Sequence, residues 1–300
     1  MGNKRTYNHT SRTLRQNGDE VDMNKNQYKI RLEQLKELYN IGKKVSLLVE
    51  NKKPTTIRSW QAEKVVEKVL LHCNSIIKLF AIGMEDYSEL DIGLVASASR
   101  NIMDAGNIYF YITERGISEE EVEFRYNLQS LNYEKNIKDI FKKLDFPMDS
   151  FWIRVLDSHS AAEEIKKSSI YVKADNNGKS SILSGKQLFN KKPVGIFDRE
   201  LESAIYNILS NSIHSFYIGL SNNSIQRSGI FASYIDSVML SIIAVEVAIV
   251  YAAHIINDYL LLRRQLSKKI TDGERDKIRE LMDIGYLSDY LEAKRNEFRK

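Results

Sequence analysis

Hydrophobic residues recur mostly every three or four positions along the chain from Lys25 onward, which is the spacing of one face of an α-helix. Only 3 prolines and 14 glycines interrupt the 300 residues, whereas an all-β fold needs a turn signal about every 8–12 residues. The pattern therefore predicts an all-α fold. The expected helices cover 25–49, 57–82, 90–114, 118–144, 149–167, 198–217 and 230–269, and two shorter charged helices follow Thr271 and Ser288.

Two segments lack this helical periodicity. Residues 1–24 are polar and basic, and we expect them to form a disordered tail. Residues 168–196 contain a short β-like run, an Asn-Asn-Gly turn signal and many small polar residues, which indicates a hairpin or an inserted loop. The sequence thus predicts one helical domain over 25–300, with an irregular insertion at 168–196 and a charged helical end at 271–300.

The stretch SEEE, residues 118–121, has the form of a capping box at the start of a helix. Ser118 can accept a hydrogen bond from the backbone of the third helical residue, while the side chain of Glu121 reaches back to the cap. The acidic first turn also suits the positive end of the helix dipole.

The most apolar stretch, 238–256, could form either a membrane span or the central helix of a bundle. Its nineteen residues, VMLSIIAVEVAIVYAAHII, approach the length that crosses a bilayer, and a basic segment follows. Glu246, however, lies near the centre, where a carboxylate costs about 2.5 kcal/mol or more in a membrane. Together with Asp236, His254, Asn257 and Asp258 it forms a polar seam on one half of the helix. The pattern favours a long apolar helix at the centre of a multi-helix bundle, and the membrane span is the alternative.

The bulk composition is that of a globular protein, with 43% hydrophobic and 28% charged residues. The net charge of +4 is mildly basic, and much of the excess lies in the first 16 residues, so the sequence lacks the concentrated patch of a dedicated nucleic-acid-binding domain. The single cysteine, Cys73, excludes an intramolecular disulfide and fits a reducing cytosol. Because the polar N-terminus has no apolar signal segment, we expect a cytoplasmic protein. Abundant Lys, Asn and Ile suggest a bacterial source.

Two further apolar helices carry polar stripes at helical spacing. Arg100, Asp104, Asn107 and Tyr111 share one face of 90–114. The stripe on 198–217 consists of Glu200, Ser203, Asn207, Ser210 and His214. Since an unpaired buried charge costs several kcal/mol, we expect the stripes to face each other, with Arg100 paired to Asp104 and His214 nearby. The alternative is that each stripe is the solvated side of its helix.

The segments SRNIMDAGNIYFYI, EEVEFRYNLQSLNYEKNIKDIFKKL and AIYNILSNSIHS together resemble an uncharacterised prokaryotic all-helical family. Its motifs are an Arg with an acidic residue four positions later, an Arg in the next helix, and Tyr-x-x-Leu-Ser-x-x-x-His. The resemblance covers roughly residues 60 to 265. The matching positions are Arg100, Asp104, Arg125, Tyr206, Leu209, Ser210 and His214.

The layout is also reminiscent of HEPN domains, helical bundles that often act as ribonucleases in toxin and defence systems. This resemblance implies metal-independent RNA cleavage, with His214 as acid or base and an arginine at the phosphate. The sequence departs from the HEPN signature because no arginine precedes His214 on its own helix, so Arg100 or Arg125 would have to supply the cation.

Three functions remain open at this point. The first is a defence or toxin component with HEPN-like activity on RNA, for which the candidate catalytic residues are His214, Arg100, Asp104, Arg125 and Ser210. The second is a non-enzymatic module that binds a partner protein, in which the polar stripes are structural networks. The third is a membrane-anchored effector that uses 238–256. The sequence has no Gly-rich phosphate loop, HExxH, GxSxG or zinc-spaced cluster, so we expect no cofactor and no metal.

Overall fold

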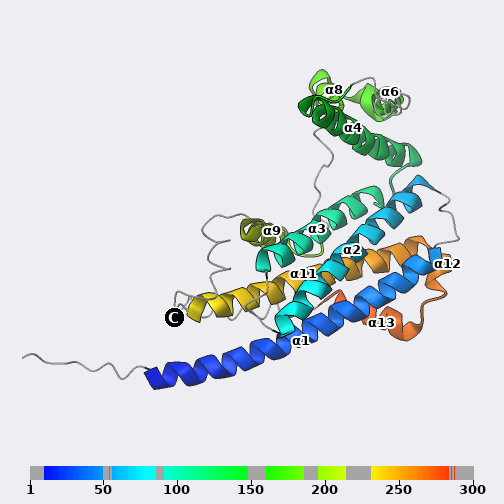
Figure 1. Ribbon diagram of the computed structural model, residues 1–300. Coiled ribbons are helices and arrows are strands. Elements are labelled where there is room, and N and C mark those ends of the chain that lie inside the picture. Colours follow the sequence, from blue (N-terminus) through cyan, green and yellow to red (C-terminus); the bar gives the residue numbers. More distant parts are fainter. Residues whose placement is uncertain are drawn as a thin grey trace, which may run out of the picture. The chain divides into compact units, whose positions relative to one another are not determined.

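The computed structural model describes residues 10–49, 54, 56–85, 91–147, 160–185, 195–213, 231–283, 285 and 287. Within these ranges every regular element is a helix, which confirms the predicted all-α class (Figure 1). The elements are α1 (Thr10–Val49), α2 (Ile57–Glu85), α3 (Ile92–Ile112), α4 (Glu119–Lys143), α6 (Ala161–Lys167), α7 (Ser169–Lys173), α8 (Asn176–Leu183), α9 (Arg199–Ile213), α11 (Phe231–Leu262), α12 (Arg264–Ser267) and α13 (Asp272–Leu281).

The chain divides into two compact units where the sequence predicts one domain. Unit 1 comprises Met1–Lys52, Val65–Gly106 and Val194–Lys300. Unit 2 comprises Lys53–Lys64 and Asn107–Pro193. The boundaries fall inside α2 and α3, so each of these helices contributes to both units.

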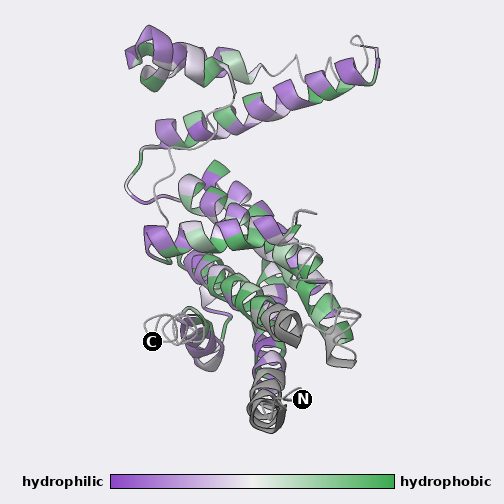
Figure 2. Ribbon diagram, turned by 90° about the vertical axis from the view of Figure 1, so that its left-hand side faces the viewer, coloured by the Kyte–Doolittle hydropathy of each residue, from purple (hydrophilic) through white to green (hydrophobic). Residues whose placement is uncertain are grey.

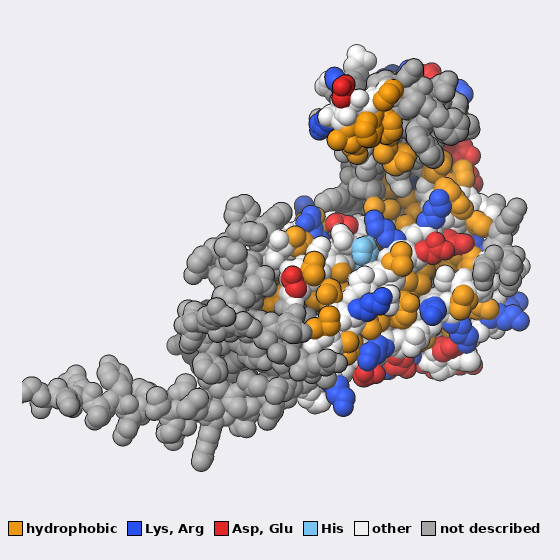
Figure 3. Space-filling view, viewed as in Figure 1, with side chains coloured by type: hydrophobic (Ala, Val, Ile, Leu, Met, Phe, Trp, Pro, Cys, Tyr) orange, Lys and Arg blue, Asp and Glu red, His pale blue; other side chains and the backbone are white. Residues whose placement is uncertain are grey.

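Helix α11 forms the centre of unit 1. All residues from Ser241 to Ala253 are buried, and α1 and α2 run beside α11 (Figure 1). The aromatic rings of Tyr28 (α1) and Phe80 (α2) stack with centroids 3.7 Å apart, and the Tyr28 hydroxyl donates to the Phe80 carbonyl at 2.8 Å. The face shown in Figure 3 carries hydrophobic side chains interspersed with charged ones. The predicted central apolar helix is thus the core of unit 1.

The carboxylate in the middle of α11 has a cation inside the same unit. Glu246 is 1% exposed; its Oε2 accepts from Arg31 Nη2 at 3.2 Å and its Oε1 from the Leu287 backbone N–H at 2.9 Å. Among the described residues, Leu240–Leu262 is the one helix long and apolar enough to cross a membrane, and 83% of its most apolar window is buried. A paired carboxylate and burial on all sides are what a core helix requires.

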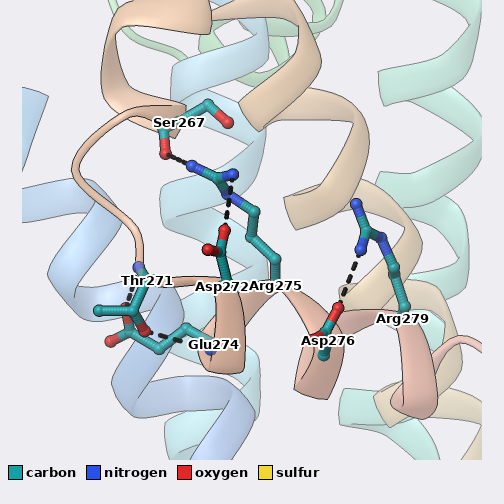
Figure 4. A network of polar contacts seen from close by, with 7 residues as sticks. All are labelled: Ser267, Thr271, Asp272, Glu274, Arg275, Asp276 and Arg279. Carbon is teal, nitrogen blue, oxygen red and sulfur yellow. Dashed lines mark hydrogen bonds and ion pairs between the residues drawn. The ribbon is translucent and has the colours of Figure 1, made fainter.

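The chain after α11 folds back through two short helices. Thr271 caps α13: its Oγ1 accepts from the Glu274 N–H at 3.3 Å, and Glu274 Oε2 accepts from the Thr271 N–H at 2.8 Å (Figure 4). Arg275 donates to the Ser267 carbonyl at 2.5 Å, and Lys44 of α1 donates to Glu274 at 2.8 Å. The predicted charged helix after Thr271 is confirmed, while the one expected after Ser288 lies outside the described residues.

Helix α4 organises unit 2 through one apolar face. Phe124, Leu128 and Leu131 pack with Ala161 and Ile165 of α6 in a buried cluster. As predicted, Ser118 caps the helix, with its Oγ accepting from the Glu121 N–H at 3.2 Å. The side chain of Glu121, which was expected to reach back to the cap, instead accepts from Arg125 at 2.5 Å, so only the Ser118 half of the predicted capping box is present.

The segment expected to be a hairpin or loop is partly helical, because two caps start helices within it. Ser168 Oγ accepts from Ile170 N–H at 3.2 Å and begins α7, and Asp175 Oδ1 accepts from Gly178 N–H at 2.6 Å and begins α8. The Asn-Asn-Gly stretch is therefore the first turn of a helix. The structure describes the insertion up to residue 185 and again from 195.

Two helix boundaries also differ from the prediction. Helix α1 begins at Thr10, inside the segment 1–24 that was expected to be disordered. Extending an existing helix by one residue costs far less than starting one, so a polar segment without apolar periodicity can continue a packed helix. The second boundary is the end of α11, which was predicted near residue 269. Arg263 has φ −107° and ψ 63°, which are not helical values, so α11 ends at Leu262 before α12 begins.

Candidate functional site

A polar cluster forms in unit 1 where α3, α9 and α11 meet. Helices α3 and α9 run antiparallel, because positions 93, 100 and 104 of α3 lie near positions 212, 206 and 202 of α9. A Cβ added at Gly93 would lie 3.2 Å from the Ser212 carbonyl, and Arg100 forms a hydrogen bond with Tyr206. Asp104 and Glu202 both lie near enough to Tyr251 for their charges to raise its pKa.

Arg100 is the cation of this cluster. Its Nη2 donates to the Tyr206 hydroxyl at 2.7 Å, and its guanidinium carbon lies 4.8 Å from the centroid of the Tyr206 ring. Its Nε lies 3.8 Å from Asp104 Oδ2. The Arg100 side chain is 29% exposed and that of Asp104 46% exposed, so solvent and solutes can reach both. The predicted pairing of Arg100 with Asp104 is therefore present, as a long contact.

Tyr251 of α11 is the buried residue of the cluster. Its ring is fully buried, and a Cβ added at Gly106 of α3 would come within 2.7 Å of it, so only glycine allows this approach. Burial, followed by the charge and contact of Glu202 and the charge of Asp104, raises the pKa of the Tyr251 phenol well above its usual range. The Tyr251 hydroxyl has no hydrogen-bond partner among the described residues, and Glu202 acts on it through its charge. Tyr251 therefore stays protonated at neutral pH.

The stripe predicted on α9 does not face α3. Glu200, Ser203 and Asn207 are exposed, as is Asn211 beside them. The side of α9 that meets α3 and α11 carries Glu202 and Tyr206, one helical turn apart. For these stripe residues the solvated-face alternative is the correct one.

Ser210 and His214 were the remaining candidates on α9. The Ser210 hydroxyl is buried and has no hydrogen-bond partner within the described part of the chain. His214 lies outside the described residues, immediately after the end of α9 at Ile213. Its predicted proximity to Arg100, Asp104 or Arg125 therefore stays a prediction.

The polar seam of α11 serves a different part of unit 1. Glu246 meets Arg31 of α1, as described above. For His254, burial lowers the pKa, while the Met282 backbone and the charge of Asp283 act in the opposite direction. This seam thus faces α1 and the segment after α13, whereas the α3 and α9 residues form the cluster around Tyr251.

Arg125 belongs to unit 2 and is fully engaged there. Its Nη1 donates to the Tyr111 carbonyl, and its Nη2 contacts Glu121 at 2.5 Å and Glu114 at 2.7 Å. Its guanidinium also lies over the Tyr111 ring at 4.2 Å. Burial opposes the charged form, but the hydrogen bonds to Glu114 and Glu121 raise the pKa of Arg125 above its usual value. These contacts connect the end of α3 to α4, so Arg125 has a structural role in unit 2.

Other reactive groups are spread apart. Within the described ranges no group of three or more His, Cys, Asp and Glu side chains could hold a metal ion. Burial raises the pKa of the Cys73 thiol to about 12, so this thiol is not a nucleophile at neutral pH. Burial, and next to it the charge of Lys68, lower the pKa of His72.

Comparison with family models, with curated proteins and with solved structures gave no significant match.

The sequence pointed to Arg100, Asp104 and Tyr206, and the structure brings these three together. The sequence did not point to Glu202 or Tyr251. Glu202 is one helical turn before Tyr206, and that spacing could have indicated it. Tyr251 lies in a continuous apolar run, where no local signal distinguishes a tyrosine of the cluster from a core residue.

Proposed function

We propose that the protein acts on RNA, and that the cluster of Arg100, Asp104 and Tyr206 contacts the phosphate backbone. The observation that carries this proposal is the partly exposed guanidinium of Arg100. Its Nη2 is held by the Tyr206 hydroxyl, while Nη1 has no hydrogen-bond partner among the described residues. An arginine fixed on an aromatic ring presents its remaining donors in a set direction, which suits a phosphate oxygen. The meeting of motif positions from two distant helices, Arg100 and Asp104 on α3 and Tyr206 on α9, supports the same site.

In this proposal the RNA 2′-hydroxyl attacks the adjacent phosphorus, and the bond from phosphorus to the 5′-oxygen breaks. Arg100 stabilises the negative charge that builds up on the non-bridging oxygens. His214, assigned this role by the HEPN-like resemblance, takes the proton of the 2′-hydroxyl and returns it to the leaving 5′-oxygen, and Ser210 belongs to the same motif. The carboxylates of Asp104 and Glu202 reduce the positive potential of the cluster, so we expect binding through few phosphates.

The test measures RNA binding and RNA cleavage separately. Fluorescence anisotropy with a labelled single-stranded RNA should show at least a tenfold weaker Kd for Arg100→Ala. The slope of the logarithm of the affinity against the logarithm of the salt concentration should fall by about one, as expected for the loss of one phosphate contact. Arg279→Ala is the matched control, because Arg279 is an exposed arginine of unit 1 that pairs with Asp276. His214→Ala should abolish cleavage while it leaves the Kd within about twofold. An Arg100→Ala variant that is folded and binds and cleaves RNA like the wild type would contradict the proposal.

The second candidate is a non-enzymatic interaction module, and the engagement of Arg125 within unit 2 favours it. In that case the cluster around Arg100 only fixes α9 on α3. Arg100→Ala would then lower the melting temperature without any RNA phenotype. The third candidate, a membrane-anchored effector, is disfavoured by the Arg31–Glu246 pair within the core. Fractionation of a lysate by ultracentrifugation tests it, and we expect recovery in the supernatant without detergent.

A further inference from the structure

Helix α4 has a second apolar face opposite the one that packs on α6. Tyr133, Ile140 and Leu144 are 59%, 47% and 56% exposed, and Ile137 lies between them. At 100° per residue this stripe points about 180° away from Phe124, Leu128 and Leu131. Figure 2 shows hydrophobic and hydrophilic residues alternating along the helix. A helix needs only one apolar face to join a core, so the second face requires another explanation.

The stripe differs from the other exposed apolar residues. Leu47, Leu71 and Leu94 are strongly exposed but lie on three different helices, as single residues. Residues 133, 137, 140 and 144 alternate in steps of four, three and four, which is the spacing by which one helix packs along another. The chemistry of the partner is therefore that of a helix with a matching apolar stripe.

We propose that this stripe is a dimer interface, on which α4 of a second copy of the chain packs antiparallel. A two-fold axis midway between Ile137 and Ile140 would place Tyr133 against Leu144 of the partner subunit. The same axis would place Ile137 against Ile140 of the partner subunit. Each of these two pairs brings together two large apolar side chains, as the a and d positions of antiparallel helices do.

The charges beside the stripe are compatible with this arrangement. The two copies would share both flanks of the stripe, with Asn136 and Lys143 of each chain on one flank and Glu134 and Phe141 on the other. In the antiparallel register the amide of one copy faces the ammonium of the other, and no two like charges meet there. Lys143 is already balanced within its own helix by Asp139, at 2.7 Å. Charge therefore does not oppose the pairing.

The exposed apolar area of the stripe predicts a weak dimer. The exposed parts of Tyr133, Ile140, Leu144 and nearby Phe146 amount to on the order of 400 Å² per copy. With the flanking polar residues, two copies would bury roughly 1,000–1,200 Å², the lower edge of the range for specific interfaces. We expect dissociation at micromolar concentrations. This inference is independent of the RNA proposal, because the stripe belongs to unit 2 and the Arg100 cluster to unit 1.

Analytical ultracentrifugation of the full chain tests the interface. The wild type should pass from monomer to dimer between about 1 and 200 μM, and Leu144→Glu should weaken association at least tenfold. Leu71→Glu is the matched control, since Leu71 is a somewhat more exposed leucine, 68% exposed, on α2; it should leave association unchanged. A wild type that is monomeric throughout this range overturns the proposal, whether the stripe is covered by 148–159 of its own chain or by another protein. Equal association of the wild type and Leu144→Glu also overturns it.

Spin labels test the antiparallel register. The only native thiol, Cys73, is buried, so a single introduced cysteine can be labelled selectively. Across the proposed axis a label at Lys142→Cys should be offset along the helix by about 10 Å from its copy, and one at Glu123→Cys by about 45 Å. Electron–electron distances should therefore be short for the first and long for the second. Similar distances at both positions would indicate a parallel pair and overturn the arrangement.

Discussion

Arg31 of α1 and Glu246 of α11 form an ion pair in the interior of unit 1, with 3.2 Å between Nη2 and Oε2 and side-chain exposures of 7% and 1%. The second oxygen of Glu246 binds the Leu287 N–H, so a single carboxylate connects three separate parts of the chain. Such a pair contributes little over an apolar replacement, but breaking it leaves a buried charge without its opposite charge.

Removing one partner of this pair should therefore destabilise the protein strongly. We expect Glu246→Leu and Arg31→Met each to lower the free energy of unfolding by about 3–5 kcal/mol, while the double variant recovers most of the loss. Urea unfolding of the three variants measures this. Lys36→Ala, which breaks the exposed pair with Glu33, should cost less than about 0.5 kcal/mol. A double variant as unstable as the sum of the two single ones would show that the pair is not coupled.

The buried phenol of Tyr251 should make the protein less stable in alkali. Above pH 10 the unfolded chain loses this proton while the folded chain keeps it, because burial and Glu202 raise the pKa of Tyr251. The unfolded state then binds fewer protons, so the free energy of unfolding falls by about 1.4 kcal/mol per pH unit. Tyr251→Phe should remove this part of the slope in unfolding experiments at pH 9, 10 and 11. Cys73→Ala should remove a second part between pH 9 and about 12, and unchanged slopes would contradict the assigned burial.

The end of α4 offers a stabilising substitution. Asp145 has φ +54°, and the Phe146 N–H donates to the Phe141 carbonyl at 2.8 Å, which together form a Schellman motif. Glycine adopts this left-handed conformation without the steric cost of a side chain, so Asp145→Gly should stabilise by about 0.5–1 kcal/mol. Asp139→Gly, within the helix, should instead destabilise by about 0.5 kcal/mol, through the poorer helix propensity of glycine and the loss of the pair with Lys143. Thermal unfolding distinguishes the two, and a loss of stability in Asp145→Gly would show that Asp145 makes a contact of its own.

The capping box of α13 should stabilise the folded protein by a similar amount. Thr271→Ala removes the acceptor for the Glu274 N–H, and we expect a loss of about 1 kcal/mol. Ser75→Ala, on the exposed side of α2, is a suitable reference and should change stability by less than about 0.5 kcal/mol. Comparable values for the two variants would mean that the box is not formed in solution.

Helix positions and termini were predictable because they depend on local chemistry. The 3.6-residue periodicity located α2, α3, α4 and α11, and the cap at Ser118 was predicted from a Ser followed three residues later by Glu. The helix after Thr271 was also predicted, although its cap was not. The helix start at Asp175 was missed because Asn-Asn-Gly is equally compatible with a turn and with the first turn of a capped helix. The start of α1 was missed because a polar segment can propagate a helix without carrying any periodic signal.

The partners of the polar residues were less predictable, since they depend on which helices become neighbours. Periodicity identified Arg100, Asp104 and Glu246 as polar residues on apolar helices. It could not show that Glu246 pairs with Arg31, 215 positions away, or that Tyr206 rather than Asn207 faces Arg100. A difference of one residue on a helix changes the direction by 100°, and only tertiary packing fixes which direction is inward.

The contact between Leu287 and Glu246 has a consequence for biosynthesis. Unit 1 is assembled from three stretches of the chain, and the residues of unit 2 lie between them in the sequence. When the last residues of unit 2 leave the ribosome, neither Glu246 nor Leu287 has yet been added, so unit 2 can fold before unit 1. Arg31 meets its carboxylate only 215 positions later, and Glu246 meets its backbone partner after a further 41. Unit 1 therefore closes after unit 2, and until Leu287 emerges the apolar surface of α11 is open to aggregation.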